Sequence, residues 1–485
     1  MRHRPSVDLD VVRARLEALR EHDLPTHGGH TLAYVYDSGL PDVDRLGREA
    51  LSMYASSNGL DPTAFPSLLQ MENDLVGVAA RLLGGAEAVG SVTSGGTESV
   101  LLAVLAARDA RPDVARPQMV LPTTAHAAFL KAAHYFGVEA VLVDVDPRTY
   151  RADPEAMRSA VTDDTVLLAG SAPSYAHGVV DPIPEIAAVA AEAGARCHVD
   201  ACIGGWVLPH LPADDRAAVP EWTFAVAGVT SVSVDLHKYA YTPKGVSLLL
   251  HRTPALRRPQ YFASADWPGY TMLNSTMQST KSGGPLAAAW AVTTAIGVSG
   301  YAALARQARA GAVALASAIG AEWEPGLEHV RVVVEPDSTL LAVESDGACD
   351  VFTIADEMLE RGWYVQPQLA YRGMPATLHL TVSAATEPGV DEFLAALEES
   401  VTAAVQAGPV VVDPGLAGAA AALDPATLDD AAFDGLLQLA GLAGAGGLAM
   451  PQRMASVNAL LDIAPAPLRE ALLVAFLDRL QRPSP

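Results

Sequence analysis

A lysine between two apolar runs is the residue of this chain best placed for covalent chemistry. Lys238 lies in the stretch Ser233-Val234-Asp235-Leu236-His237-Lys238-Tyr239, and an apolar run over residues 246–250 follows. A primary amine held at the end of a β-strand can bind a cofactor aldehyde, such as that of pyridoxal phosphate (PLP). The alternative is that Lys238 and Lys244 are solvated lysines flanking a turn.

A carboxylate ends another apolar run. The stretch Arg196-Cys197-His198-Val199-Asp200 is followed by a loop that contains Gly204 and Gly205. An anion beside a pyridine nitrogen keeps the ring protonated, so that the ring can act as an electron sink. Asp200 is the candidate for this role, and the alternative is an aspartate that caps a strand-to-loop turn.

A glycine-rich turn offers a site for a phosphate. Residues 89–99 read as a short strand, a turn and a helix start, with Gly95, Gly96 and Thr97 in the turn. Backbone N–H groups and the helix dipole favour an anion there, and glycine lets a phosphate approach closely. The alternative is an ordinary loop. His126, at the start of the next helix, could stack on a cofactor ring or simply cap that helix.

The chain alternates short apolar runs with helical stretches. Strands are expected near residues 119–121, 140–143, 166–168, 196–199 and 229–234, and helices near 125–136, 154–160 and 184–193. This alternation is typical of a mostly parallel sheet covered by helices. Ligands of such sheets bind beyond the carboxyl ends of the strands, where Asp200, Lys238 and the turn at residues 94–97 would meet.

Composition changes divide the chain into four parts. We expect an N-terminal segment over 1–60, a large domain over 61–300, a smaller α+β domain over 301–407, and an Ala/Gly/Leu-rich helical tail over 408–485. A helical stretch over 286–310, interrupted near Gly297 and Gly300, should carry the chain out of the large domain. The tail shows no catalytic cluster, so packing or oligomer contact is its expected role.

Bulk properties exclude several classes of partner. A net charge of −24, with 32 Lys and Arg against 56 Asp and Glu, disfavours nucleic acid. No uninterrupted apolar stretch is long enough to span a membrane, and the N-terminus lacks the apolar core of a secretory signal, so we expect a cytoplasmic protein. Three cysteines make a poor disulfide framework, and His27-Gly28-Gly29-His30 has no carboxylate or cysteine at ligand spacing, so no metal is expected.

Taken together, these motifs resemble the group II PLP-dependent decarboxylase superfamily, and most closely the sphingosine-1-phosphate lyase family. The resemblance covers about residues 30 to 400 and rests on five stretches in order. They are Thr93-Ser94-Gly95-Gly96-Thr97-Glu98-Ser99, Ala125-His126-Ala127 with Lys131 to Gly137, Ala172-Pro173 with His177-Gly178-Val179-Val180-Asp181-Pro182, His198-Val199-Asp200-Ala201-Cys202, and Asp235 with His237-Lys238-Tyr239 and Pro243-Lys244-Gly245.

The resemblance implies the fold type I PLP-dependent transferase architecture. Such a protein has a large domain with a mostly parallel, seven-stranded-type sheet and a smaller α+β C-terminal lobe, and forms a homodimer. The family pattern gives Lys238 the Schiff base, Asp200 the pyridinium nitrogen and His126 the ring face. It gives the cofactor phosphate to Gly95, Gly96, Thr97 and His237, with Ser279 and Thr280 reaching that phosphate from the partner subunit. Lys244, Tyr175 and Tyr34 or Tyr36 would face the substrate.

One position departs from the family pattern. The lyases usually have a histidine after Asn-Pro-Leu, where this chain has Asp61 after Asn58-Gly59-Leu60. That histidine helps to bind the substrate phosphate, and a carboxylate in its place would repel one.

The expected reaction is cleavage of a bond at the α carbon of an amine substrate. Retro-aldol cleavage of a β-hydroxy amine, phosphorylated or not, to an aldehyde and an amine is the first hypothesis, because Lys244 and Tyr175 are present. Decarboxylation of an L-amino acid is the alternative. An aminotransferase lacks an obvious paired arginine, and a non-catalytic PLP-binding homologue fits poorly with an intact Lys238, Asp200 and His126.

Overall fold

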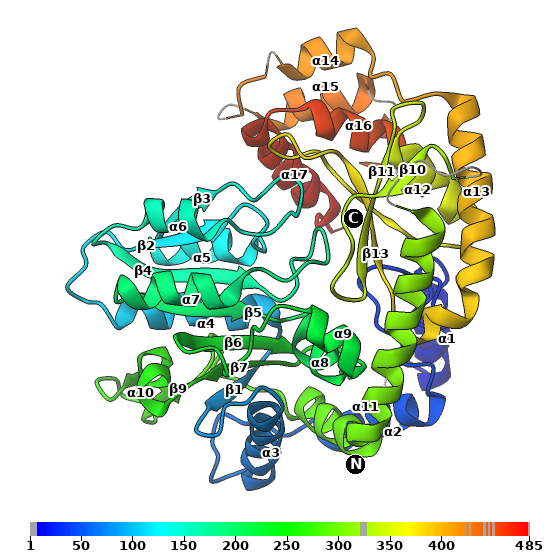
Figure 1. The fold of residues 1–485 in the computed structure, drawn as a ribbon. Helices are drawn as coiled ribbons and strands as arrows, with labels where there is room; N and C mark the ends of the chain where they lie inside the picture. The colour runs from blue at the N-terminus through cyan, green and yellow to red at the C-terminus, as the bar shows by residue number, and fades with distance from the viewer. Residues whose placement is uncertain are drawn as a thin grey trace.

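The computed structural model divides the chain into two lobes and a C-terminal helical region (Figure 1). It describes residues 7–320, 327–421, 423–425, 428–439, 443–444, 447–448 and 452–483. The N-terminal helices α1 (Leu9–Leu19), α2 (Pro41–Met53) and α3 (Pro66–Leu82) precede the first strand.

The large lobe is built on a seven-stranded sheet. Its order is β1-β7-β6-β5-β4-β2-β3, in which β7 runs antiparallel to both of its neighbours and the other pairs are parallel. The strands are β1 (Val89–Thr93), β2 (Gln118–Pro122), β3 (Glu139–Val143), β4 (Thr165–Ser171), β5 (Arg196–Asp200), β6 (Val229–Asp235) and β7 (Ser247–His251). The parallel strands β4, β5 and β6 therefore end at one edge of the sheet.

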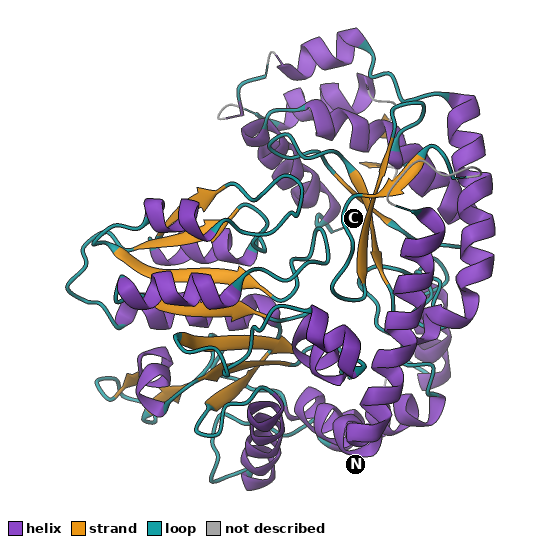
Figure 2. Cartoon of the chain, in the orientation of Figure 1, coloured by secondary structure: helices purple, strands orange, loops and turns teal. Residues whose placement is uncertain are grey.

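Helices cover both faces of this sheet (Figure 2). One face packs on α4 (Gly96–Asp109) and α5 (Ala128–Phe136) through a cluster that includes Val104 and Phe129. The other face packs on α3, α7 and α8 through a cluster that includes Leu75, Ile186 and Trp206. The remaining elements of the lobe are α6 (Pro154–Ala160), α7 (Ile183–Glu192), α8 (Gly204–Val207), η1 (Leu208–His210), α9 (Ala213–Ala218), α10 (Pro254–Arg257), η2 (Arg258–Gln260), β8 (Phe262–Ser264) and β9 (Met272–Asn274).

The long helix α11 (Gly283–Ile319) carries the chain into the small lobe. Its backbone breaks at Gly297, where φ is +61°, at the interruption that the sequence predicts. The small lobe has an antiparallel sheet in the order β10-β11-β13-β12. Its elements are β10 (Val330–Val332), β11 (Leu340–Ser345), α12 (Val351–Glu360), β12 (Gln366–Gln368), β13 (Thr377–Thr381), η3 (Ala384–Gly389) and α13 (Val390–Ala407).

Four helices of the C-terminal region lie beyond the small lobe. They are α14 (Pro414–Ala421), α15 (Asp430–Leu439), α16 (Ala455–Ile463) and α17 (Ala466–Leu480), with a short hairpin of β14 (Ala443–Gly444) and β15 (Gly447–Leu448). The buried carboxylate of Asp356 on α12 accepts hydrogen bonds from the backbone N–H groups of Met454 and Ala455 at 2.8 and 2.9 Å. Asp462 accepts one from the N–H of Ala370 at 2.6 Å. The region is thus joined to the small lobe at two points.

The α/β fold class and the mostly parallel sheet are confirmed. The predicted boundary at residue 300 falls inside α11. This helix continues past the break at Gly297, and its residues contribute to the hydrophobic cores of both lobes. Among the described residues, α11 is also the one helix long and apolar enough to cross a membrane by length and composition. Core helices meet the same criterion, and 39% of its most apolar window is buried.

We expect Gly178→Ala to destabilise the junction between the lobes. Gly178 has φ +74°, and an added Cβ would overlap the carbonyl oxygen of Leu340 at the start of β11. The free energy of unfolding should fall by at least about 2 kcal/mol in chemical denaturation. Gly137→Ala, with φ +64° and open space around its Cβ, is the matched control and should cost only about 1 kcal/mol. Equal losses in the two variants would contradict the overlap.

Candidate active site

A cavity of about 390 Å³ opens at the carboxyl ends of β4, β5 and β6. Three of its lining residues, Ser171, Asp200 and Asp235, are the last residues of these strands. Eight residues predicted from the sequence line it together, namely Gly95, Gly96, Thr97, His126, Tyr175, Asp200, His237 and Lys238. The parallel sheet thus brings motifs from five separate stretches to one place.

Lys238 lies in the turn that follows β6. Its Nζ is 3.0 Å from Oδ2 of Asp235, and both side chains are largely buried. Burial disfavours the charged amine, but the attraction of Asp235 and other neighbours outweighs this effect and raises the pKa of Lys238 above its usual value. Without a covalent partner, Lys238 is therefore an ammonium group.

Asp200, at the end of β5, is held as an anion in the same cavity. Its Oδ1 accepts the backbone N–H of Cys202 at 3.1 Å and the hydroxyl of Ser233 at 3.4 Å. Burial alone would raise the pKa of Asp200, but His126 and the contact with Cys202 outweigh it and lower that pKa. His198, two residues earlier on β5, hydrogen-bonds Ser231 and Ser233 at 2.9 and 3.2 Å. These contacts fix the carboxylate in a polar row between β5 and β6.

The glycine-rich turn forms a narrow cradle at the start of α4. An added Cβ on Gly96 would lie 2.7 Å from Sγ of Cys202 and 2.8 Å from both carboxylate oxygens of Asp235, so only glycine fits. Glu98 braces the turn, because its two oxygens accept the N–H groups of Ser94 at 2.6 Å and of Met277 at 2.8 Å. The free backbone N–H groups of a helix start are suited to a phosphate.

Two rings lie on the walls of the cavity. The rings of His126 and Tyr175 lie 6.5 Å apart and nearly perpendicular. His126 also caps α5, because its Nδ1 accepts the N–H of Ala128 at 3.1 Å. Tyr175 donates its hydroxyl proton to Oε1 of Gln366 at 2.6 Å and stacks on His379 at 4.1 Å. Burial raises the pKa of Tyr175, so its hydroxyl stays protonated.

Lys244 is a second lysine near the cavity, with a partly exposed side chain and a different environment. Its Nζ donates to the carbonyl oxygens of Tyr34 at 2.7 Å and His237 at 3.3 Å, and lies 5.0 Å from the ring centre of Tyr36. Burial, together with repulsion from Lys238, lowers the pKa of Lys244 to about 8. Of the two tyrosines, Tyr36 packs edge-on against Tyr239 inside the fold, whereas the side chain of Tyr34 is exposed.

Six predicted residues do not line this cavity within one chain, namely Tyr34, Tyr36, Asp61, Lys244, Ser279 and Thr280. Asp61 and Ser279 line a separate cavity of about 820 Å³, and Thr280 is near it in the same loop. Asp61 accepts hydrogen bonds from the N–H and hydroxyl of Thr63 at 2.8 and 2.6 Å, which lowers the pKa of Asp61. Asp61 is therefore an ionised, exposed carboxylate.

Sequence reasoning gave no role to four residues of the site. Asp235 could have been found from its position at a strand end, three residues before Lys238. Glu98 could have been found from its place in the first turn of the helix that follows the glycines. Gln366 and His379 gave no local signal, because they come from β12 and β13 of the other lobe and reach Tyr175 only through the fold.

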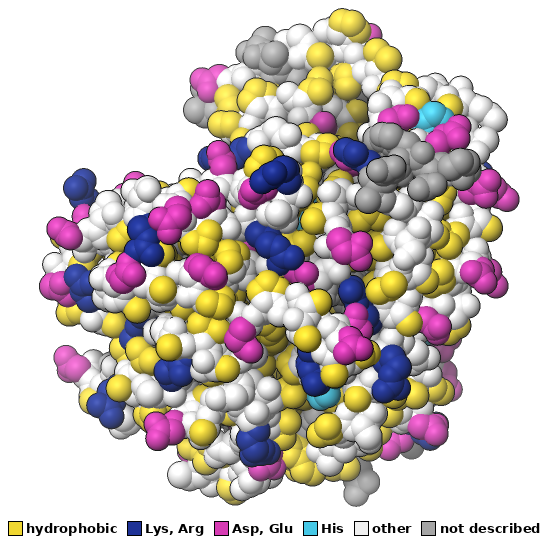
Figure 3. All heavy atoms as spheres, in the orientation of Figure 1, with side chains coloured by type: hydrophobic (Ala, Val, Ile, Leu, Met, Phe, Trp, Pro, Cys, Tyr) yellow, Lys and Arg dark blue, Asp and Glu magenta, His cyan; other side chains and the backbone are white. Residues whose placement is uncertain are grey.

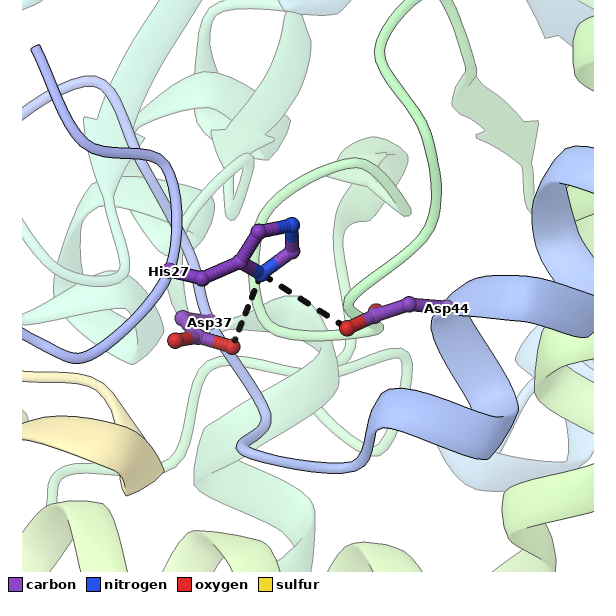
Figure 4. A group of neighbouring side chains, drawn as sticks. All are labelled: His27, Asp37 and Asp44. Carbon is purple, nitrogen blue, oxygen red and sulfur yellow. Dashed lines mark ion pairs between the residues drawn. The ribbon is translucent and has the colours of Figure 1, made fainter.

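A histidine and two carboxylates gather near the N-terminus, although sequence spacing gave no sign of it (Figure 4). Nδ1 of His27 lies 3.6 Å from an oxygen of Asp37 and 3.6 Å from one of Asp44. Asp37 also accepts the N–H groups of Gly28 and Gly39 at 2.7 and 2.9 Å. His30 turns away and stacks on Trp363 at 4.0 Å. The cluster therefore ties the loop before α2 to that helix.

The residues of the cavity fit PLP. The cofactor needs an amine for its aldehyde, an anion for its ring nitrogen and a cradle for its phosphate. Lys238, Asp200 and the Gly96 turn supply these three groups around one space. Two further features of this space suit a polar guest, since Oδ1 of Asp235 is buried without a hydrogen-bond partner and a side chain on Gly96 would fill the cradle.

Comparisons with known proteins point the same way. Residues 26–324 match the family described as the pyridoxal-dependent decarboxylase conserved domain, and residues 414–479 match one described as the C-terminal putative HTH domain of pyridoxal-dependent enzymes. Sphingosine-1-phosphate lyase of Dictyostelium discoideum is 36% identical over 75% of this chain and 67% of its own length. Sphingosine-1-phosphate lyase 1 of Rattus norvegicus is 34% identical over 85% of this chain and 72% of its own.

A solved structure extends the likeness to three dimensions. The sphingosine-1-phosphate lyase of Burkholderia pseudomallei superposes with a TM-score of 0.76 at 33% identity, covering 84% of this chain and 94% of that chain. Fold and sequence therefore agree on the same group of relatives.

We expect Gly96→Ala to weaken cofactor binding. The new methyl group must push away Cys202 or the Asp235 carboxylate, and it narrows the cradle. Affinity for PLP, measured by absorbance titration of the cofactor-free protein, should fall at least about tenfold, which corresponds to about 1.4 kcal/mol. Gly77→Ala on α3, where the nearest atom is a flexible arginine tip at 3.4 Å, is the control and should bind PLP like the wild type. Unchanged affinity in Gly96→Ala would show that the turn does not hold the phosphate.

Proposed function

The chain belongs to the pyridoxal-dependent decarboxylase family, among the sphingosine-1-phosphate lyases, and we propose that its substrate is a phosphorylated amino alcohol. It is a PLP-dependent lyase that cleaves the Cα–Cβ bond of a β-hydroxy amine to give an aldehyde and an amine. The observation that carries the substrate proposal is 34% identity, over 85% of the chain, to a lyase named for a phosphorylated amino alcohol.

Each cofactor contact is assigned to a residue of the cavity. PLP, when bound, supplies an aldehyde for the substrate amine and a ring that withdraws electrons from bonds at the α carbon. Lys238 is the amine that binds the aldehyde, and Asp200 is the anion that holds a proton on the ring nitrogen. His126 orients the ring by stacking on it. Gly95, Gly96, Thr97 and the neutral His237 hold the phosphate.

Lys244 and Tyr175 are the proposed partners of the β-hydroxyl group. Breaking the Cα–Cβ bond of a β-hydroxy amine requires that the hydroxyl lose its proton as the aldehyde forms. Lys244 has a lowered pKa and donates only to carbonyl oxygens, so its neutral form can accept that proton. Tyr175 keeps its own proton and stacks on His379. If its hydroxyl turned from Gln366 to the substrate, it could donate a hydrogen bond to the hydroxyl oxygen. Tyr36 and the backbone of Tyr34 contact the amine of Lys244.

We also propose that the enzyme works as a homodimer. Ser279 and Asp61 line a second cavity of their own chain and not that of Lys238. A partner subunit that places its cofactor there would receive Ser279 and Thr280 at its phosphate and Asp61 at its substrate. Asp61 would then disfavour a phosphate at the point where the related lyases have histidine, so the substrate phosphate must find its cations elsewhere.

The net charge and the cysteines support proposals on the partners and the cellular location of the enzyme. The visible face mixes acidic and basic side chains without a broad basic area (Figure 3), and the net charge is −24. We therefore propose a small-molecule amine substrate and no nucleic-acid partner. All three cysteines are buried and unpaired, which fits a reducing, cytoplasmic location without a membrane span.

The products separate the lyase from a decarboxylase. The purified protein should show the imine absorbance of bound PLP, and Lys238→Ala should lose it. With sphingosine 1-phosphate the wild type should release a long-chain aldehyde, and with L-amino acids it should release no carbon dioxide above the Lys238→Ala background. Carbon dioxide from amino acids without aldehyde from the phosphorylated amine would overturn the proposal in favour of a decarboxylase.

Cleavage should depend on pH through Lys244. Only the neutral amine can take up a proton, so with a pKa of about 8 we expect kcat to rise as the pH increases through about 8. Lys244→Arg stays charged over this range, and should lower kcat at least about tenfold and abolish the rise. Tyr175→Phe should lower kcat but keep the rise. A wild-type profile in Lys244→Arg would remove Lys244 from the proposed role.

A further inference from the structure

A buried carboxylate of undefined function lies beside the cofactor-binding lysine. Asp235 is 2% exposed, its Oδ2 is 3.0 Å from Nζ of Lys238, and its Oδ1 has no hydrogen-bond partner. We propose that Asp235 is the counter-ion that makes Lys238 a proton donor, so that Lys238 protonates the substrate α carbon while Lys244 takes the hydroxyl proton. This inference deepens the proposed lyase function and rests on it.

Lys238 and Lys244 have opposite surroundings. Lys238 has a carboxylate at hydrogen-bond distance, whereas the hydrogen bonds of Lys244 go to carbonyl oxygens alone among the described residues. Titratable groups of one type whose environments differ in this way commonly divide the acid and base roles of a reaction. The pKa of Lys238 is raised and that of Lys244 is lowered, which is the order that an acid and a base require.

Four other groups near Lys238 do not take the place of Asp235. Burial raises the pKa of Tyr36 and of Cys202, so both remain uncharged. His237 is kept neutral by burial, and its Nδ1 accepts the N–H of Val246 at 3.2 Å, which leaves the ring proton on Nε2. Asp200 is an anion, but in the proposed site it serves the ring nitrogen. Asp235 is the carboxylate that forms an ion pair with Nζ.

The proton balance of the reaction closes within this set of groups. The O–H bond of the hydroxyl and the Cα–Cβ bond break, and the carbonyl double bond of the aldehyde and a new Cα–H bond form. Lys244 gains the hydroxyl proton, and Lys238 gives one proton to the α carbon, so no outside reactant is needed. Asp235 stays ionised throughout and attracts the next proton to Lys238.

The test measures Lys238 itself in the cofactor-free enzyme. An amine-selective acylating reagent reacts only with a neutral amine, and peptide mass spectrometry gives the labelling rate of each lysine between pH 6 and 11. We expect Lys238 of the wild type to label slowly at pH 8. Asp235→Asn removes the charge but keeps the shape, and should raise that rate at least tenfold and move the pH profile of Lys238 downward.

Two control lysines distinguish this effect from a general loosening of the protein structure. Lys131 is exposed on α5 and should label equally in all variants. Glu72→Gln removes the carboxylate 2.5 Å from Nζ of Lys281, so it should speed labelling of Lys281 but not of Lys238. Asp235→Ser serves if Asp235→Asn does not fold, with the same expected result. An unchanged Lys238 profile in a folded Asp235 variant would overturn the proposal.

A kinetic measurement on the loaded enzyme distinguishes this role from the proposed function. Asp235→Asn should lower kcat for the phosphorylated amine about tenfold with little change in KM, because substrate contacts remain. If the wild type makes no aldehyde, the lyase function fails while the labelling result still stands. If the wild type makes aldehyde and the variant is unaffected in both labelling and kcat, the role of Asp235 alone fails.

Discussion

The parallel register of β5 and β6 is the constraint on which the site depends. Asp200 pairs with Ser233, so the two strands end with carboxylates at one edge, Asp200 on β5 and Asp235 on β6. His198 locks this register, because its two ring nitrogens bond Ser231 and Ser233, and Ser233 in turn bonds Asp200. A slip of one residue in either strand would turn the carboxylate of that strand to the opposite face and separate the two. The buried polar row therefore positions the ring anion and the counter-ion of the lysine at once.

The parts of the site that come from single stretches of sequence could be predicted, and the parts made by contact between stretches could not. Lys238, Asp200 and Gly96 each follow a strand in a readable pattern, and the strand–helix alternation is enough to place them at one edge. Gln366 and His379 support Tyr175 from the small lobe, and nothing in their local sequence indicates it. The cluster of His27 with Asp44 was missed for the same reason, since a loop and a helix bring it together. The antiparallel strand β7 carries an apolar run like those of the parallel strands of the sheet, so its direction has no sequence signal.

Desolvation acts on the pKa values of Lys238 and Lys244 in the same direction, and the partners of each lysine decide the outcome. Removing an ammonium group from water lowers its pKa in both cases, and a carboxylate at 3.0 Å reverses the effect for Lys238. Lys244 has carbonyl dipoles in place of a charge, which hold the amine in position without holding its proton. One residue type thus serves two purposes in neighbouring positions because Asp235, at the end of β6, lies at hydrogen-bond distance from Lys238, whereas Lys244 donates to carbonyl oxygens.

The contact between Asp356 and the start of α16 gives the C-terminal region a structural meaning. A carboxylate that is 6% exposed would be costly to bury without donors, and its donors are the N–H groups of Met454 and Ala455. The small lobe therefore has a buried carboxylate whose backbone donors come from the C-terminal region, at the start of α16. Asp462, at the end of α16, accepts a hydrogen bond from the backbone N–H of Ala370, just beyond the strand that carries Gln366. The segment that matches the family described as a putative HTH domain therefore contacts the small lobe two residues after the strand that positions Tyr175 through Gln366.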